Sequence, residues 1–308
     1  MIRRKLGLFV YGIASLMALF TIASLTGCNQ PLPFRPASGS QQAETGLTLL
    51  QRGERQRAIQ QLDSALKLAG GDYRLSLAVA ESCIMLRDWE LAAKYGEVAL
   101  KLVPRSDKDS RLNAYATLSS AYIGLGQADK AIQLAKECYA ADPSEPGAKN
   151  LLGYVYADVP VVDKLGEALE LTQQAVAAST SEGRQEEVTA TYLDSVGWVK
   201  YQQGRYDEAI IDLKRASFVL PTQPEVQYHL GKAYQKKSRY EDAATCFERT
   251  LKLSPRFTEA EQALKEVLAL MPPKTDAKPP ISAPPAGAKP ADSGPQMRST
   301  PPFPAGHP

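Results

Sequence analysis

Histidine and cysteine, the side chains that most often hold metals or act in catalysis, are scarce in this sequence. Its 308 residues include two histidines, His229 and His307, and four cysteines. A serine or cysteine nucleophile needs a histidine and an acid beside it, and the pair Asp194-Ser195 has no histidine near it in the sequence. We therefore expect neither a catalytic site nor a metal site.

Signature motifs of nucleotide and cofactor sites are missing as well. The chain has no Gly-rich phosphate loop, no zinc-type cysteine spacing and no dinucleotide-binding fingerprint. With 36 basic and 34 acidic residues its net charge is +2, too balanced to hold nucleic acid by bulk charge. We therefore expect a protein that is not an enzyme and that uses no cofactor, small-molecule substrate or nucleic acid.

The N-terminus combines a basic start, an apolar run and a cysteine. Residues 3–5 are Arg-Arg-Lys, residues 6–25 are mostly apolar, and Leu-Thr-Gly-Cys occupies 25–28. This order is typical of a secretory signal. The last four residues resemble a bacterial lipobox, which implies cleavage before Cys28 and acylation of Cys28. The alternative is an uncleaved anchor, because about 20 apolar residues can span a bilayer.

Either interpretation tethers the protein to a membrane and places the rest of the chain outside the cytoplasm. In enterobacteria an aspartate after the lipidated cysteine favours the inner membrane, so Asn29 leads us to expect the outer membrane, facing the periplasm. The three other cysteines have no metal or redox spacing and are expected to be buried or half-buried helical thiols: Cys83, Cys138 and Cys246. One disulfide among them is the alternative in an oxidising periplasm.

A period of 34 residues runs through the middle of the chain. In the clearest pair a small residue, an alanine and a proline recur after 34 residues: Gly197, Ala209 and Pro221, then Gly231, Ala243 and Pro255. This pattern resembles the tetratricopeptide repeat (TPR), in which two helices cross so closely that bulky side chains would separate them. Four weaker units precede this pair, each with a small residue in the same register: Gly46, Ala80, Ser119 and Gly153.

The resemblance implies an all-α fold, a right-handed superhelical solenoid of about six helix-turn-helix repeats with a C-terminal capping helix. Extra residues near 105–110, 158–163 and 181–187 are expected to lengthen connections or helices. The stretch 258–270 should be the cap, with its apolar face formed by Ala260, Ala263, Leu264, Val267 and Leu268.

Four segments follow from these patterns. Residues 1–27 are predicted to be a lipoprotein signal peptide, and 28–38 the lipidated cysteine with a flexible leash. Residues 39–271 are predicted to form the TPR array with its cap. The proline-rich stretch 272–308 cannot bury a core and is expected to be disordered.

In TPR proteins the first helices of successive repeats line a concave groove, with ligand contacts at fixed positions of each repeat. Carried over to repeats four to six, the resemblance implies a partner-binding groove that includes Asn150, Tyr154, Asp194, Trp198, Tyr201, Tyr228, Lys232 and Lys236. An aromatic surface with a basic edge suits an extended peptide or a partner helix. For each of the aromatic residues, packing within the repeat is the alternative role.

Taken with the lipobox, the array resembles lipidated TPR pilotins and related envelope-assembly proteins. That resemblance implies a membrane-anchored adaptor whose groove binds a protein partner during assembly of a secretion, pilus or outer-membrane complex. The alternative is an accessory protein of the cell wall or of polysaccharide export, which would bind a glycan or recruit a wall enzyme.

Overall fold

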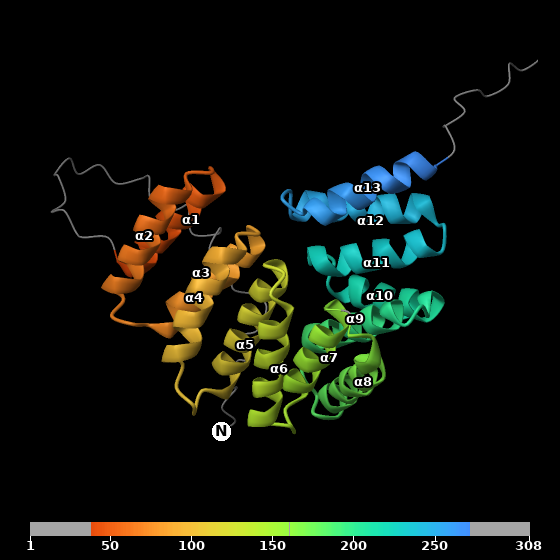
Figure 1. Cartoon of the computed structure of the whole chain (residues 1–308), viewed down its shortest axis with the longest axis horizontal. Coiled ribbons are helices and arrows are strands. Elements are labelled where there is room, and N and C mark those ends of the chain that lie inside the picture. Colours follow the sequence, from red (N-terminus) through yellow and green to blue (C-terminus); the bar gives the residue numbers. More distant parts are fainter. Residues whose placement is uncertain (1–37, 160, 272–308) are drawn as a thin grey trace, which may run out of the picture. The chain divides into compact units, whose positions relative to one another are not determined.

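The computed structural model describes residues 38–159 and 161–271, which form thirteen α-helices and no strand (Figure 1). The helices are α1 Gly39–Gln51, α2 Arg55–Leu68, α3 Tyr73–Met85, α4 Trp89–Leu102, α5 Lys108–Gly124, α6 Ala128–Ala141, α7 Pro146–Asp158, α8 Leu165–Ser181, α9 Glu186–Gln202, α10 Tyr206–Val219, α11 Pro224–Lys236, α12 Tyr240–Leu253 and α13 Thr258–Leu270. The predicted signal peptide, the lipidation at Cys28 and the proline-rich tail lie outside the described residues.

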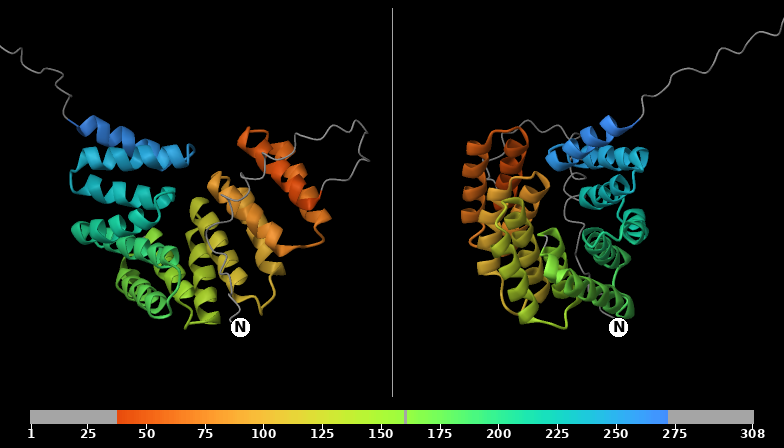
Figure 2. Two further views of the ribbon diagram at one scale, coloured as in Figure 1. Left: turned by 180° about the vertical axis from the view of Figure 1, so that it is seen from behind. Right: turned by 45° about the vertical axis from the view of Figure 1, so that its right-hand side comes forward.

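Consecutive helices pack in pairs, from α1 with α2 to α11 with α12, and α13 packs on α12. We number these pairs repeats 1 to 6. Neighbouring repeats contact one another through the second helix of one and the first helix of the next, as α8 does with α9, and also through their first helices, as α7 does with α9 (Figures 1 and 2). The prediction of an all-α solenoid with six helix pairs and a cap is confirmed.

The small residues of the 34-residue pattern stand where the two helices of a repeat cross. A Cβ atom on Gly153 would lie 2.7 Å from the Ala168 carbonyl oxygen, and one on Gly197 would lie 2.6 Å from Leu213 Cγ. The alanines on the facing helices, Ala168 and Ala209, are fully buried. Because a Cβ contact under 3 Å forces something to move, glycine lets these helix pairs approach closely.

In most repeats the second residue after the end of the first helix has a left-handed backbone. In repeats 1, 3 and 5 this residue is glycine, with φ of 82° at Gly53, 69° at Gly126 and 77° at Gly204. Repeat 2 has Arg87 at the same place with φ 55°, and repeat 6 has Ser238 with φ 56°. A residue other than glycine costs about 1–2 kcal/mol in this conformation. At Arg87 and Ser238, other contacts must offset that cost.

The irregular spacings are absorbed by longer helices and by one short helical turn. Helices α5, α8 and α9 have 17 residues, whereas the other helices have 13 or 14. A 3-10 helix, η1, spans Val162–Lys164 between α7 and α8. These observations confirm that the extra residues lengthen helices and connections.

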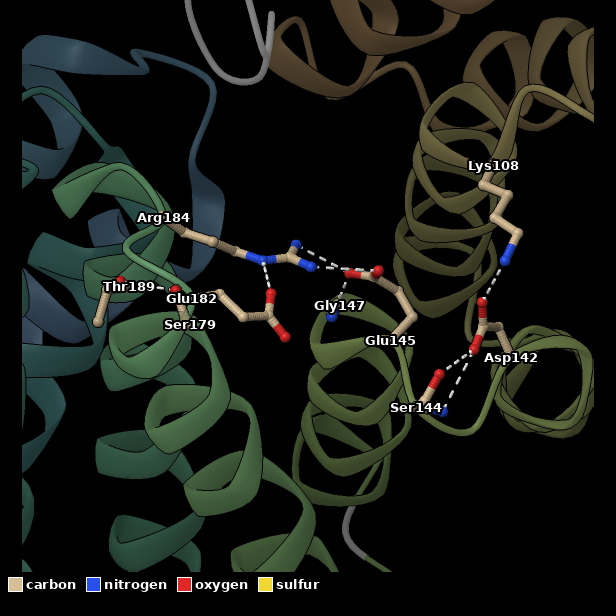
Figure 3. A network of polar contacts seen from close by, with 9 residues as sticks. All are labelled: Lys108, Asp142, Ser144, Glu145, Gly147, Ser179, Glu182, Arg184 and Thr189. Atoms are coloured by element: carbon tan, nitrogen blue, oxygen red, sulfur yellow. Dashed lines mark hydrogen bonds and ion pairs between the residues drawn. The ribbon is translucent and has the colours of Figure 1, made fainter. Parts of the chain in front are cut away.

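A polar network fastens the connection between α8 and α9 to the start of α7 (Figure 3). Arg184 in this connection donates to both Glu145 oxygens, at 2.8 and 3.2 Å. Glu145 also accepts the backbone N–H of Gly147 at 3.2 Å and so caps α7. Nearby, Lys108 in α5 pairs with Asp142 at 2.8 Å. The connection between α6 and α7 is thereby tied to the start of α5 through Asp142 and to the α8–α9 connection through Glu145.

The cap α13 has the predicted bounds, but one residue of its predicted apolar face is wrong. Ala260, Ala263 and Val267 are buried, whereas Leu268 is 50 % exposed. The reason is that α13 packs against repeat 6, and no further repeat among residues 38–271 covers its other side. Within the described ranges, none of the helices combines the length and apolarity needed to cross a membrane.

The three cysteines of the array are buried free thiols, as predicted. Cys83 lies in α3, Cys138 in α6 and Cys246 in α12. Burial raises the pKa of each thiol to about 12.

Candidate functional site

Aromatic rings from the first helices of repeats 4 to 6 gather around His229 in α11. The Trp198 ring is stacked on Tyr201, with centroids 4.7 Å apart, and on His229, with centroids 4.2 Å apart. Trp198 is 6 % exposed and Tyr201 is 9 % exposed. Both side chains therefore pack within the array, and a ligand contact by either of them stays a prediction.

Two carboxylates hold this stack in place. His229 Nδ1 lies 3.0 Å from Asp194 Oδ2, and Trp198 Nε1 donates to Asp158 Oδ1 at 3.0 Å. Asp194 lies in α9 and His229 in α11, 35 residues apart, which is close to one repeat period. This pairing was not predicted from the sequence, although the 34-residue period was the signal that could have indicated it.

Burial and neighbouring charges shift the pKa values of His229, Asp158 and Glu225. Burial disfavours the charged imidazole of His229, but the carboxylates of Asp194, Asp158 and Glu225 outweigh burial, so the pKa of His229 is raised. Burial raises the pKa of Asp158 and of Glu225, and the charge of His229 offsets part of each rise. Helices α7, α9 and α11, which we call the inner helices, thus hold more carboxylates than His229 can neutralise, so a cation bound here would be stabilised.

Tyr154 and Tyr228 are the more accessible rings of this cluster, since both are half-buried. The Tyr154 ring lies 6.3 Å from that of His229, and the Tyr228 ring lies 4.9 Å from that of Phe257. Burial raises the pKa of Tyr228 to about 12, so the hydroxyl stays protonated near neutral pH. These two tyrosines can offer ring surface and a hydroxyl donor to a ligand.

The other predicted groove residues stand apart from this stack. Asn150 in α7 is half-buried, and its Oδ1 accepts no hydrogen bond from the described residues. Lys232 is half-buried and Lys236 exposed near the end of α11. Burial lowers the pKa of Lys232, while the nearby carboxylate of Glu266 opposes that change. The structure therefore brings five of the eight predicted residues together and leaves Asn150 and the two lysines outside the aromatic cluster.

A contact between distant repeats, which no sequence pattern indicated, borders the cluster. Arg87, between α3 and α4, donates from Nη2 to both Glu259 oxygens, at 2.7 and 2.6 Å. Its guanidinium carbon also lies 3.9 Å from the centroid of the Phe257 ring and 4.6 Å from that of Trp89. The turn of repeat 2 is thereby joined to the start of the cap.

A second arginine makes a parallel contact. Arg256, between α12 and α13, donates from Nη2 to the carbonyl oxygens of Gln51 at 3.0 Å and Leu50 at 3.3 Å. The last carbonyls of a helix have no partner within it, so Arg256 satisfies the end of α1. We call the contacts of Arg87 and Arg256 the clasp.

Comparison with known families agrees with the repeat register. A model described as TPR repeat matches residues 197–238, and models described as tetratricopeptide repeat match 44–107, 112–145 and 224–257. A TPR repeat-containing protein of Pseudomonas aeruginosa is 27% identical over 183 residues, which are 59% of this chain and 29% of that protein. The chain thus spans less than a third of that relative.

Solved structures show the same architecture. A tetratricopeptide repeat protein from Parabacteroides merdae superimposes with a TM-score of 0.55 at 15% identity, covering 77% of this chain and 87% of that one. Yeast Tom70 superimposes with a TM-score of 0.51 at 18% identity, covering 75% of this chain and 46% of that one. At these identities the likeness concerns the fold alone. The chain is a tetratricopeptide repeat protein, and its fold is a scaffold for protein–protein interaction.

Proposed function

We propose that the inner helices α7, α9 and α11 bind an extended peptide or a helix of a protein partner. The observation that carries this proposal is the cluster of rings and carboxylates around His229. Tyr154 and Tyr228 are its accessible members and would contact the partner, while the buried Trp198 and Tyr201 hold them in position. Large rigid rings bury much area at a low cost in conformational entropy, which suits a binding surface.

The test is partner capture by crosslinking in intact cells, with tyrosine variants of the full chain. The double variant Tyr154→Ala/Tyr228→Ala should lose the partner that the parent captures, with helicity unchanged by circular dichroism. Tyr139→Ala is the matched control, because Tyr139 is also half-buried but lies in α6, a second helix. Retention of the partner by the double variant, or its loss in the control, would contradict the proposal. Trp198 is a poor choice, because its removal would leave a cavity in the core.

We also propose that this scaffold works at the cell envelope, tethered through a lipid on Cys28 at the outer membrane and facing the periplasm. The lipobox-like sequence at 25–28 and the basic and apolar residues before it support this. There it would serve as an adaptor in the assembly of a secretion, pilus or outer-membrane complex.

Metabolic labelling with a clickable palmitate analogue tests the anchor. The parent should take up label and sediment with membranes, and Cys28→Ser should do neither. Cys138→Ser, which removes a buried thiol of the array, should behave as the parent does. Equal labelling of the parent and Cys28→Ser would rule out lipidation at this residue.

A further inference from the structure

The Arg87 side chain is 11 % exposed although it stands in a turn between two helices. Burial of a guanidinium needs partners, and Arg87 has three: the Phe257 ring, the Trp89 ring and the Glu259 carboxylate. Phe257 itself is 5 % exposed. Phe257 and Glu259 thus form a site with the composition of an arginine receptor, a ring face next to a carboxylate.

The backbone of Arg87 supports the view that its side chain is there for this contact. At the same place repeats 1, 3 and 5 have glycine, which adopts a positive φ without strain, and repeat 6 has Ser238 with φ 56°. Arg87 holds φ 55° instead. A strained backbone conformation persists where surrounding contacts stabilise it, and the partners of the Arg87 guanidinium provide such contacts.

The arginine receptor is continuous with the aromatic cluster of the inner helices. The Tyr228 ring contacts the Phe257 ring with centroids 4.9 Å apart. The charge of Arg87 also acts on Glu225, whose pKa burial raises and the charges of His229 and Arg87 lower in part. If Arg87 left, Glu225 and Glu259 would lose a cation, and another cation would be favoured in its place.

The clasp consists of side-chain contacts between segments that are far apart in the sequence. It links the α3–α4 turn to the α12–α13 connection, two segments that lie close in every view (Figures 1 and 2). Its contacts are the ion pair, the ring contacts of Arg87 and the hydrogen bonds from Arg256. Glu259 is 52% exposed, so water can replace its bonds while each repeat keeps its own helix-pair core.

We propose that Arg87 is an internal ligand, which occupies the Phe257–Glu259 site and keeps the groove closed until an arginine-bearing segment of a protein partner displaces it. This inference rests on the proposed function of the inner helices and names the chemistry of the partner. Arginine is expected rather than lysine because its planar guanidinium stacks on a ring while it donates to a carboxylate.

Distance measurements between two spin labels test the clasp without any partner. The full chain would carry Gln56→Cys and Glu248→Cys, both exposed positions, and Cys28→Ser, so that the thiols other than the introduced ones are the buried Cys83, Cys138 and Cys246. Arg87→Gly should give a longer and broader distance distribution than the parent. Glycine suits the left-handed backbone there, so the variant is expected to fold.

Lys94→Ala is the matched control, because Lys94 also pairs with a carboxylate and lies over a ring. Its partners are Asp63 in repeat 1, at 2.6 Å, and the Tyr95 ring in repeat 2, at 5.0 Å, and both lie outside the clasp. It should leave the distances unchanged. Identical distributions for the parent and Arg87→Gly would overturn the closed state.

Binding of a fluorescent hexa-arginine peptide tests the internal ligand. Arg87→Gly should bind it about tenfold more tightly than the parent, which corresponds to a parent closed in about nine of ten molecules. Adding Glu259→Gln should abolish this gain, and hexa-lysine at the same salt concentration should gain less. Equal affinity of the parent and Arg87→Gly, or a gain that survives Glu259→Gln, would overturn the assignment.

Failure of this inference differs from failure of the proposed function. If Arg87→Gly changes neither distance nor affinity while Tyr154→Ala/Tyr228→Ala loses its partner, the groove stands and the internal ligand is wrong. If Arg87→Gly opens the array and gains affinity while the tyrosine variant keeps its partner, the internal ligand stands and binding does not run through the tyrosines.

Discussion

At the scale of single residues, the fold depends on glycines, which have no side chain, where the two helices of a repeat cross. Among the crossing glycines, Gly153 is the one at which an added Cβ atom would lie closest to a backbone atom, the carbonyl oxygen of Ala168, at 2.7 Å. A backbone atom in a packed helix cannot rotate away, as the end of a long side chain can. The small residue is therefore required by the helix that faces it.

We predict that Gly153→Ala destabilises the protein by about 1–3 kcal/mol, the usual cost of overpacking. Thermal unfolding should show a midpoint lower by roughly 2–4 °C for each kcal/mol lost. Gly166→Ala is the control, because Gly166 is exposed in α8 and a Cβ there would meet nothing within 4 Å. Equal midpoints for the two variants would show that the crossing is not tight.

At the scale of elements, connections between repeats do more than join helices. The longest departure from the 34-residue period precedes α9, and there Arg184 reaches back to Glu145 at the start of α7 (Figure 3). Arg184 is 30% exposed and Glu145 28%, so the pair is partly shielded from water. By contrast Lys108, which pairs with Asp142, is 76% exposed.

We expect Arg184→Ala to lower stability by about 1–3 kcal/mol, since it leaves the half-buried Glu145 carboxylate without its cation. Lys108→Ala should lower stability far less than Arg184→Ala does, because exposed ion pairs contribute little. Urea denaturation of both variants would measure the difference. Should Lys108→Ala prove the more damaging, our ranking of the two ion pairs by burial would be wrong.

At the scale of the whole molecule, charges from three repeats meet around His229, which makes stability depend on pH. The pKa of His229 is raised, so its contribution to stability is complete below about pH 6.5 and is lost as pH rises through the folded-state pKa. Asp158 and Glu225 also have raised pKa values, so their burial costs stability as they ionise with rising pH. All three groups act in the same direction.

The parent should therefore unfold at a higher temperature at pH 6 than at pH 8, as calorimetry at matched salt would show. His229→Gln should flatten this difference. His307→Gln, the other histidine of the chain, is the control and should keep the parent profile. A steep profile in His229→Gln would place the titrating group elsewhere.

The sequence predicted the parts of this molecule that repeat and missed those that occur once. Helix pairs, crossing glycines and the bounds of α13 all follow from a 34-residue period, since each repeat packs on its neighbours in the same way. Leu268 was misplaced because a terminal helix has a neighbour on one side only. The contact of Arg87 with Glu259 spans 172 residues, and no periodic rule relates such distant positions.

For the groove, the period placed Tyr154, Trp198 and Tyr228 on neighbouring helices, and the structure confirms that arrangement. The 34-residue period could not predict that Trp198 is buried, because burial depends on how tightly successive repeats stack. Which of these rings touches a partner stays a prediction.

The buried thiols have a consequence for the chemistry of the chain before it folds. With a pKa raised to about 12 by burial, each of Cys83, Cys138 and Cys246 is almost entirely in the thiol form at pH 7. Because only the thiolate attacks an oxidant, the folded array is nearly inert to disulfide exchange. Any disulfide found among these three cysteines would therefore record oxidation of a chain that had not yet folded.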